Sequence, residues 1–143
     1  MFSRRQPNHH PPVETCSFGR EKQSRHQLTS ITIEPMIIKC RFVPKDFCVN
    51  LFGTLWVKDP SWIDRHVVNH ERIHTAQQRE LLWIPFYLFY FVEWIIRLLI
   101  ERNVNRAYMN LSFEREAYAH GHDLNYLSRR KHYAWLKLLF KSK

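Results

Sequence analysis

Apolar and polar positions follow different patterns in successive parts of this chain of 143 residues. Residues 1–30 show no apolar period and are punctuated by Pro, Ser and Gln, which is typical of a disordered segment. From Ile31 the composition changes, and Met36 opens an apolar part that can fold. We therefore expect residues 1–35 to be a disordered basic extension and residues 36–143 to be the domain, with Met36 as an alternative start of translation.

Two runs rich in Ile, Val, Phe, Leu and Trp come next, over residues 37–43 and 48–57. Pro44-Lys45-Asp46 between them predicts a turn, and Gly53 lies inside the second run. Runs of β-branched and aromatic residues bounded by turn residues are typical of strands. These runs predict a small N-terminal antiparallel sheet of two or three strands.

A helix is predicted to start at Asp59-Pro60-Ser61, with its proline early and with Ser61 and Asp64 in an approximate capping box. Residues at alternating spacings of four and three then share one face of this helix, and the histidines lie there among apolar residues: Ile63, Val67, His70, His74, Gln77 and Leu81. The two histidines are therefore expected to point toward the interior.

Pro85 is expected to break or kink this helix, and residues 86–100 are apolar nearly all round except at Glu93 and Arg97. These two are four residues apart, so they can pair on one face. Counted from Leu81, the apolar stretch has 20 residues, which is the length of a membrane span, although both charges are costly in a bilayer. A buried helix, a helix on a membrane surface and a single span over 81–100 all stay open.

The last part of the chain is also expected to be helical. A helix is predicted over residues 107–122, with Gly121 or Asp123 at its end, and one or two closing helices over residues 124–140. These closing helices carry a face rich in Lys and Arg. Their aromatic and leucine residues either pack on the core or lie on anionic lipid.

The net charge of +9 is unevenly distributed: residues 1–30 contribute +3, residues 31–128 contribute 0 and residues 129–143 contribute +6. No nucleic-acid-binding motif accompanies these basic ends, so we expect no nucleic-acid partner. Three cysteines without a C-x-x-C pair, and no N-terminal signal segment, predict reduced thiols in the cytoplasm. Association with the inner face of the membrane stays open.

The motif His70-Glu71-x-x-His74 carries the candidate chemistry. Residues four apart stack on one face of a helix, so the two imidazoles can bind one Zn²⁺, while Glu71 can act as a general base toward water. A zinc finger of the C₂H₂ type is excluded by spacing, because Cys40 and Cys48 are separated by seven residues and Cys48 lies 22 positions before His70.

A hydrolytic zinc site needs a third protein ligand, which Glu114 or Glu116 can supply from a later helix. Two residues apart on a helix differ by about 200°, so both cannot face one metal. The segment Glu114-Arg115-Glu116-Ala117 after His-Glu-x-x-His resembles gluzincin-like domains of the CAAX-prenyl and ImmA/IrrE peptidase types. The chain is also similar to short bacterial proteins with the motifs His-Glu-Arg-Ile-His and Phe-Glu-Arg-Glu-Ala-Tyr.

This resemblance covers residues 62–120 and implies an α+β, mostly helical zincin-like domain with Zn²⁺ as cofactor. It implies His70, His74 and Glu114 as metal ligands, Glu71 as catalytic base, and a peptide or protein as substrate. The families usually have Asp or Asn after the Ala, where this chain has Tyr118. Three residues are candidates for orienting the ligands: Tyr118, Glu116 and Gln77.

The implied function is a zinc-dependent metallopeptidase. The alternative from another class is a membrane-associated binding or regulatory protein that keeps a metal-stabilised helix pair and hydrolyses nothing. A third interpretation needs no metal, because His70 and His74 can be core histidines satisfied by Glu114.

Overall fold

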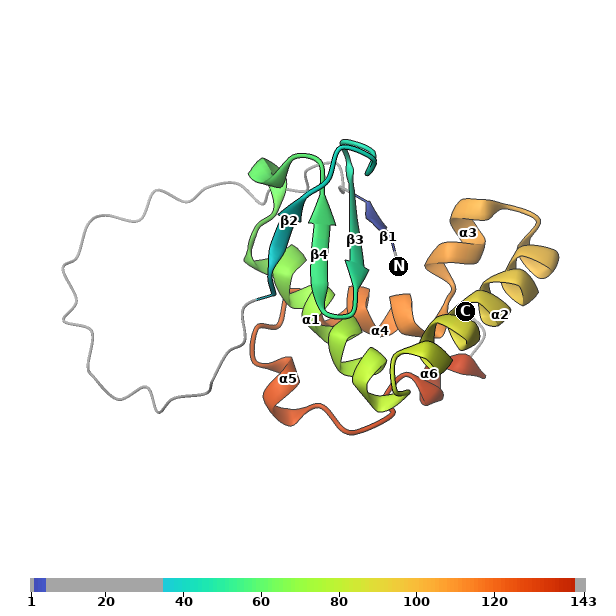
Figure 1. The fold of residues 1–143 in the computed structure, drawn as a ribbon. Coiled ribbons are helices and arrows are strands. Elements are labelled where there is room, and N and C mark those ends of the chain that lie inside the picture. The colour runs from blue at the N-terminus through green and yellow to red at the C-terminus, as the bar shows by residue number, and fades with distance from the viewer. Residues whose placement is uncertain (1, 5–34, 141–143) are drawn as a thin grey trace, which may run out of the picture.

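The computed structural model describes residues 2–4 and 35–140, in which a small sheet lies against a group of helices (Figure 1). The strands are β1 (Phe2–Arg4), β2 (Ile37–Lys39), β3 (Phe47–Leu51) and β4 (Thr54–Val57). The helices are the 3₁₀ turn η1 (Pro60–Trp62), α1 (Arg65–Glu80), α2 (Ile84–Glu101), α3 (Val104–Met109), α4 (Ser112–His120), α5 (Tyr126–Arg129) and α6 (Leu136–Leu139). The expected α+β class, mostly helical with a small sheet near the N-terminus, is confirmed.

The sheet has the order β1-β3-β4-β2 and is mixed. β3 and β4 form an antiparallel hairpin, whose turn uses the positive φ angles of Phe52 (52°) and Gly53 (77°). β2 pairs parallel with β4, so the prediction of a purely antiparallel sheet is wrong. β3 covers one edge of β4, and β2 pairs with the other edge. Residues 40–46, which connect β2 to β3, pass the end of β4.

β1 adds an outer strand to this sheet, antiparallel to β3. The prediction of disorder is therefore wrong for residues 2–4, because the open edge of β3 offers backbone groups with which an extended segment can pair. The rest of the expected extension, residues 5–34, lies outside the described residues.

α1 begins later than predicted. Asp59, Pro60 and Ser61 form the short turn η1, in which the Asp59 side chain accepts a hydrogen bond from the Ser61 backbone N–H. The N-cap of α1 is Asp64, whose carboxylate accepts from the backbone N–H groups of His66 and Val67. One aspartate thus satisfies two N–H groups of the first turn, which sets the start of the helix there.

The predicted break before Pro85 is confirmed. α1 ends at Glu80, Leu82 and Trp83 have positive φ angles, and Pro85 lies in the first turn of α2. Among the described residues, no helix by itself has both the length and the apolar character to cross a membrane. α1 and α2 reach that length together, but their axes differ in direction by 110°.

The single helix predicted over residues 107–122 is wrong, because the chain breaks at Asn110 and Leu111 between α3 and α4. Glu93 of α2 accepts hydrogen bonds from the backbone N–H and the hydroxyl of Ser112, so a carboxylate from another helix caps α4. Gly121 is the C-cap of α4, as expected. The predicted ion pair of Glu93 and Arg97 is present, with 3.7 Å between carboxylate and guanidinium.

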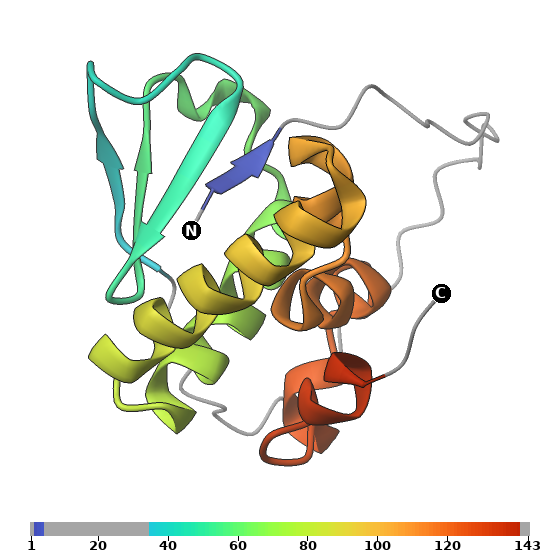
Figure 2. The same cartoon turned by 90° about the vertical axis from the view of Figure 1, so that its right-hand side faces the viewer.

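Two apolar clusters hold the helices together. One joins α2, α4 and the C-terminal segment through Phe86, Phe113 and Trp135. The other joins α1, α4 and α5 through Ile73, Ala117 and Tyr126. These contacts fix α4 beside α1, with α2 on the outside of the molecule (Figure 2).

Candidate metal centre

The inner face of α1 carries two buried imidazoles. His70 and His74 lie one helical turn apart, and their Nε2 atoms are 3.0 Å from each other. His74 is fully buried, and the His70 side chain is 8% exposed. Both imidazole rings therefore point to the same place inside the fold, as predicted from their spacing of four residues on α1.

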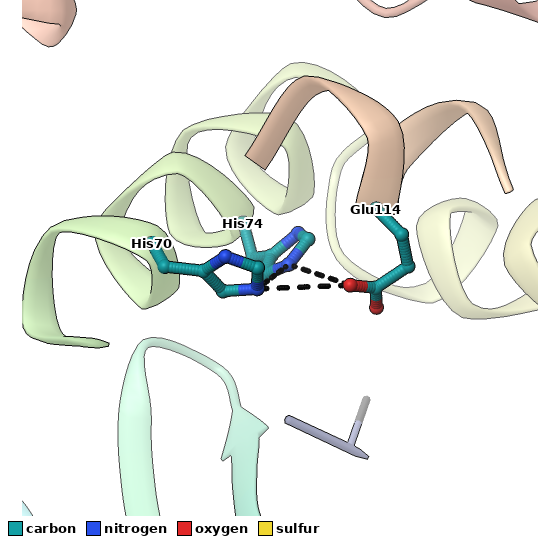
Figure 3. A group of neighbouring side chains, drawn as sticks. All are labelled: His70, His74 and Glu114. Atoms are coloured by element: carbon teal, nitrogen blue, oxygen red, sulfur yellow. Dashed lines mark hydrogen bonds and ion pairs between the residues drawn. The ribbon is translucent and has the colours of Figure 1, made fainter. Parts of the chain in front are cut away.

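α4 brings a carboxylate to the same place. The Oε2 atom of Glu114 lies 3.6 Å from the Nε2 atom of each histidine, and Figure 3 shows the three side chains converging from two helices. Ala117, on the same face of α4 as Glu114, is fully buried against Ile73 of α1. Its small side chain allows the close approach of the two helices on which this convergence depends.

The three distances suit a small tetrahedral cation. With zinc–nitrogen and zinc–oxygen bonds of about 2.0–2.2 Å, two ligands of a tetrahedral site are roughly 3.4 Å apart. The separations within the group formed by His70, His74 and Glu114 are 3.0, 3.6 and 3.6 Å. This group could therefore hold a metal ion with only small side-chain movements.

Gln77 determines which nitrogen of His74 carries the proton. Its amide nitrogen donates to the Phe113 carbonyl and to the Glu116 carboxylate, so its oxygen is the atom that faces His74. That oxygen lies 2.7 Å from Nδ1 of His74 and can only accept, which places the proton of a neutral imidazole on Nδ1. The Nε2 lone pair is then directed at the candidate metal position, as a ligand requires.

Two tyrosines hold Glu114 in place. The Tyr90 hydroxyl of α2 donates to Oε1 of Glu114 over 2.9 Å, and the Tyr108 side chain of α3 also hydrogen-bonds this carboxylate. Burial, reinforced by the Glu114 charge, raises the pKa of both phenols well above the ordinary value, so both stay protonated donors. Sequence reasoning missed Tyr90, although a tyrosine in an otherwise apolar helix needs a partner for its hydroxyl.

Glu71 is fully buried, and neither of its carboxylate oxygens has a hydrogen-bond partner within residues 2–4 and 35–140. Its charge helps to raise the pKa of His70 on one side and, after burial, that of the Cys48 thiol on the other. Glu71 therefore lies beside the histidine pair, between α1 and the sheet. A buried carboxylate without a partner is costly to the fold, so its presence calls for an explanation.

The electrostatics of the group favour a bound cation. Burial alone would raise the pKa of Glu114, but the His74 and His70 imidazoles lower it to about 2, so Glu114 stays ionised. Burial alone would lower the pKa of His70, but the carboxylates of Glu114 and Glu71 reverse this and raise it. Two buried carboxylates beside two imidazoles thus attract positive charge, which protons or a divalent metal ion can supply.

Glu116 is directed away from the histidines. It is buried and accepts from Gln77, from the Tyr126 hydroxyl and from the Arg130 guanidinium. The prediction that only one of Glu114 and Glu116 can face the histidines is confirmed. It reaches the candidate centre indirectly, through Gln77 and His74.

Tyr118 contacts His70 through its ring, with centroids 4.7 Å apart in an edge-to-face arrangement. The other histidines near this region lie outside the group and contact other rings. His66 packs against His122, and His120 stacks on Tyr126. These three histidines therefore take part in ring packing outside the group of His70, His74 and Glu114.

The chain was also compared with models of protein families, with curated protein sequences and with solved structures, and none of the three comparisons found a match.

Proposed function

We propose that this protein is a zinc-dependent peptidase, in which His70, His74 and Glu114 bind the metal and Glu71 is the general base. The observation that supports this best is Glu71 itself. The metal-free interpretation, in which the histidines are core residues satisfied by Glu114, explains the contacts within that group. It gives no reason for a fully buried carboxylate without a hydrogen-bond partner in the described chain.

Zinc is proposed because of the donor set. Two imidazole nitrogens and one carboxylate oxygen make up the usual three-ligand set of a hydrolytic zinc site. When bound, zinc acts as a Lewis acid that polarises a carbonyl group and lowers the pKa of a water molecule to about 7.

The residues of the chain then have separate tasks. Glu71 takes the proton of the attacking water and delivers it to the leaving amine. Gln77 keeps His74 in the required tautomer, and Tyr90 and Tyr108 keep Glu114 oriented. Substrate would approach on the side of His70, because His74 and Glu114 are fully buried and the His70 side chain is 8% exposed.

Metal analysis tests the first part of this proposal. We expect one zinc per chain after purification without chelator, and loss of that zinc in His70→Ala and in His74→Ala. The matched control is His132→Ala, because the His132 side chain is 89% exposed and lies outside the group. Wild-type protein without bound metal, and without zinc affinity in a titration, would refute the proposal.

Activity tests the second part. Glu71→Gln is expected to keep the metal and to lose peptide hydrolysis, measured on a mixture of peptides by mass spectrometry. If wild-type protein binds zinc and cleaves no peptide, the metal-stabilised helix pair of a binding or regulatory protein replaces the peptidase as the proposed function.

A further inference from the structure

The outward half of α2 is entirely apolar. The inward half carries Phe86, Tyr90, Glu93 and Arg97, which contact the rest of the protein. The outward half exposes large side chains along the whole length of the helix: Ile84, Leu88, Phe91, Val92, Ile96, Leu99 and Ile100. No charged residue interrupts this stripe, which at 1.5 Å per residue is about 27 Å long.

Single exposed apolar residues are common on protein surfaces, but this stripe is continuous. Leu99 is 73% exposed and Leu88 is 66% exposed, so the described chain leaves them largely uncovered. In Figure 2 α2 lies across the front of the molecule. A continuous apolar surface of this kind marks a site of contact with a membrane or a protein.

The exposed charged side chains between residues 81 and 140 have one sign. Between residues 81 and 140, every carboxylate is buried or half-buried, whereas five cationic side chains are exposed: Arg102, Arg106, Arg129, Lys131 and Lys137. Arg102 caps the C-terminus of α2, and Arg106 belongs to α3, which packs on α2. The two exposed carboxylates of the described chain, Asp46 and Asp64, belong to the segments before and after the sheet hairpin.

We propose that the outward face of α2 docks on the surface of an anionic lipid bilayer, with the helix lying in the plane of the interface. An apolar helix face with basic residues beside it is the pattern that binds such surfaces, because the apolar side chains enter the acyl boundary and the cations meet the lipid phosphates. A second copy of the chain fits less well, because pairing two such faces would bring like charges together.

The docked orientation would place the candidate metal centre close to the lipid. Tyr90 extends from the opposite side of α2 and touches Glu114. One helix diameter, about 10 Å, therefore separates the centre from the docking face. The docking itself does not depend on the metal, so the two proposals can fail separately.

Flotation of the full-length protein with lipid vesicles tests this proposal. We expect binding to vesicles that contain phosphatidylglycerol, weaker binding to pure phosphatidylcholine, and release by salt. The double variant Leu88→Ser/Leu99→Ser should bind at least about tenfold more weakly, because two exposed apolar side chains no longer enter the membrane. Replacing Arg102 or Lys137 by Gln should weaken binding about fivefold, and only on anionic vesicles.

The matched control is Phe42→Ser, because Phe42 is 94% exposed but lies in the connection between β2 and β3. It should bind vesicles like the wild type. All substituted residues are exposed, so each variant should keep its thermal midpoint. Absence of binding to anionic vesicles at low salt would overturn the proposal, as would unchanged binding of the leucine variant. A lipid-free dimer that the leucine substitutions convert to a monomer, without vesicle binding, would instead make this face an interface between copies.

Discussion

Two buried polar clusters share the helices α1 and α4, and they differ in how well their carboxylates are satisfied. In the first, the Arg130 guanidinium binds both Glu80 and Glu116, and Glu116 also accepts from Gln77 and Tyr126. In the second, which surrounds the histidine pair, Glu71 has no partner in the described chain and Oε2 of Glu114 accepts no hydrogen bond there.

This difference indicates different roles. A buried charge with all its partners is stable as it stands and fixes the relative position of the segments that it joins. A buried charge without partners lowers stability, and such sites are typical of places where a ligand completes the arrangement. Gln77 touches both clusters, so the satisfied cluster supports the side chain that orients His74.

The largest expected effect is a loss of stability when the cluster around Arg130 is disrupted. Arg130→Ala leaves Glu80 and Glu116 buried without their cation, which should lower the free energy of unfolding by about 3–5 kcal/mol in urea denaturation. Its neighbour Arg129 has a side chain that is 66% exposed and pairs with Asp123, so Arg129→Ala should cost less than about 1 kcal/mol. Equal effects of the two substitutions would contradict the contrast between the clusters.

The next effect distinguishes two glutamates that are two residues apart on α4. Glu114→Gln removes a proposed metal ligand and should weaken zinc affinity more than about 100-fold in a metal-competition titration, since loss of an outer partner alone costs about 10–100-fold. Glu116→Gln should change zinc affinity little, because Glu116 faces Arg130. The reverse result would make Glu116 the ligand.

A smaller loss of zinc affinity is expected at the link between the clusters. Gln77→Ala removes the hydrogen bond that sets the His74 tautomer and should weaken zinc binding about 10–100-fold. Gln78 is a matched control, because it is also a fully buried glutamine of α1 but is directed toward Asn50 in the sheet. If both variants lost affinity equally, Gln77 would act through stability alone.

The smallest expected effect is a change in the free energy of unfolding that has opposite signs in the two clusters. In the metal-free protein, Glu71→Gln replaces a buried carboxylate that has no hydrogen-bond partner in the described chain with a neutral amide. This should raise the free energy of unfolding by about 1 kcal/mol. The measurement is urea denaturation with chelator, at a pH where the imidazoles are neutral. Glu116→Gln should have the opposite sign, because it removes charge from a satisfied ion pair. Destabilisation by both would mean that Glu71 has a partner in solution.

Local spacing was enough to predict several features of the site. Residues four apart share a helix face, so the sequence predicts that His70 and His74 point together. Residues two apart point in different directions, so it also predicts that only one of Glu114 and Glu116 faces the histidines. The structure brings Glu114 to them, within 3.6 Å. The break before Pro85 was predictable for a similar reason, because a proline ring disrupts its own helix.

The features that sequence reasoning missed depend on segments far apart in the chain. β2 runs parallel to β4 because residues 40–46 pass the end of β4 to reach the start of β3, which is antiparallel to β4. α3 and α4 are separate helices because Glu93 caps α4 from α2. The partners of Glu114 and Glu80 come from positions 24 and 50 residues away.

The sequence by itself therefore determined where each helix of this protein carries its polar residues, because the helical period relates each side chain to its own axis. It did not determine which helices meet. Only the tertiary structure, through the packing of Ala117 against Ile73, brings Glu114 to the histidines and leaves Glu71 beside them without a partner in the described chain. Such packing depends on how distant segments fill space together, which no local pattern encodes.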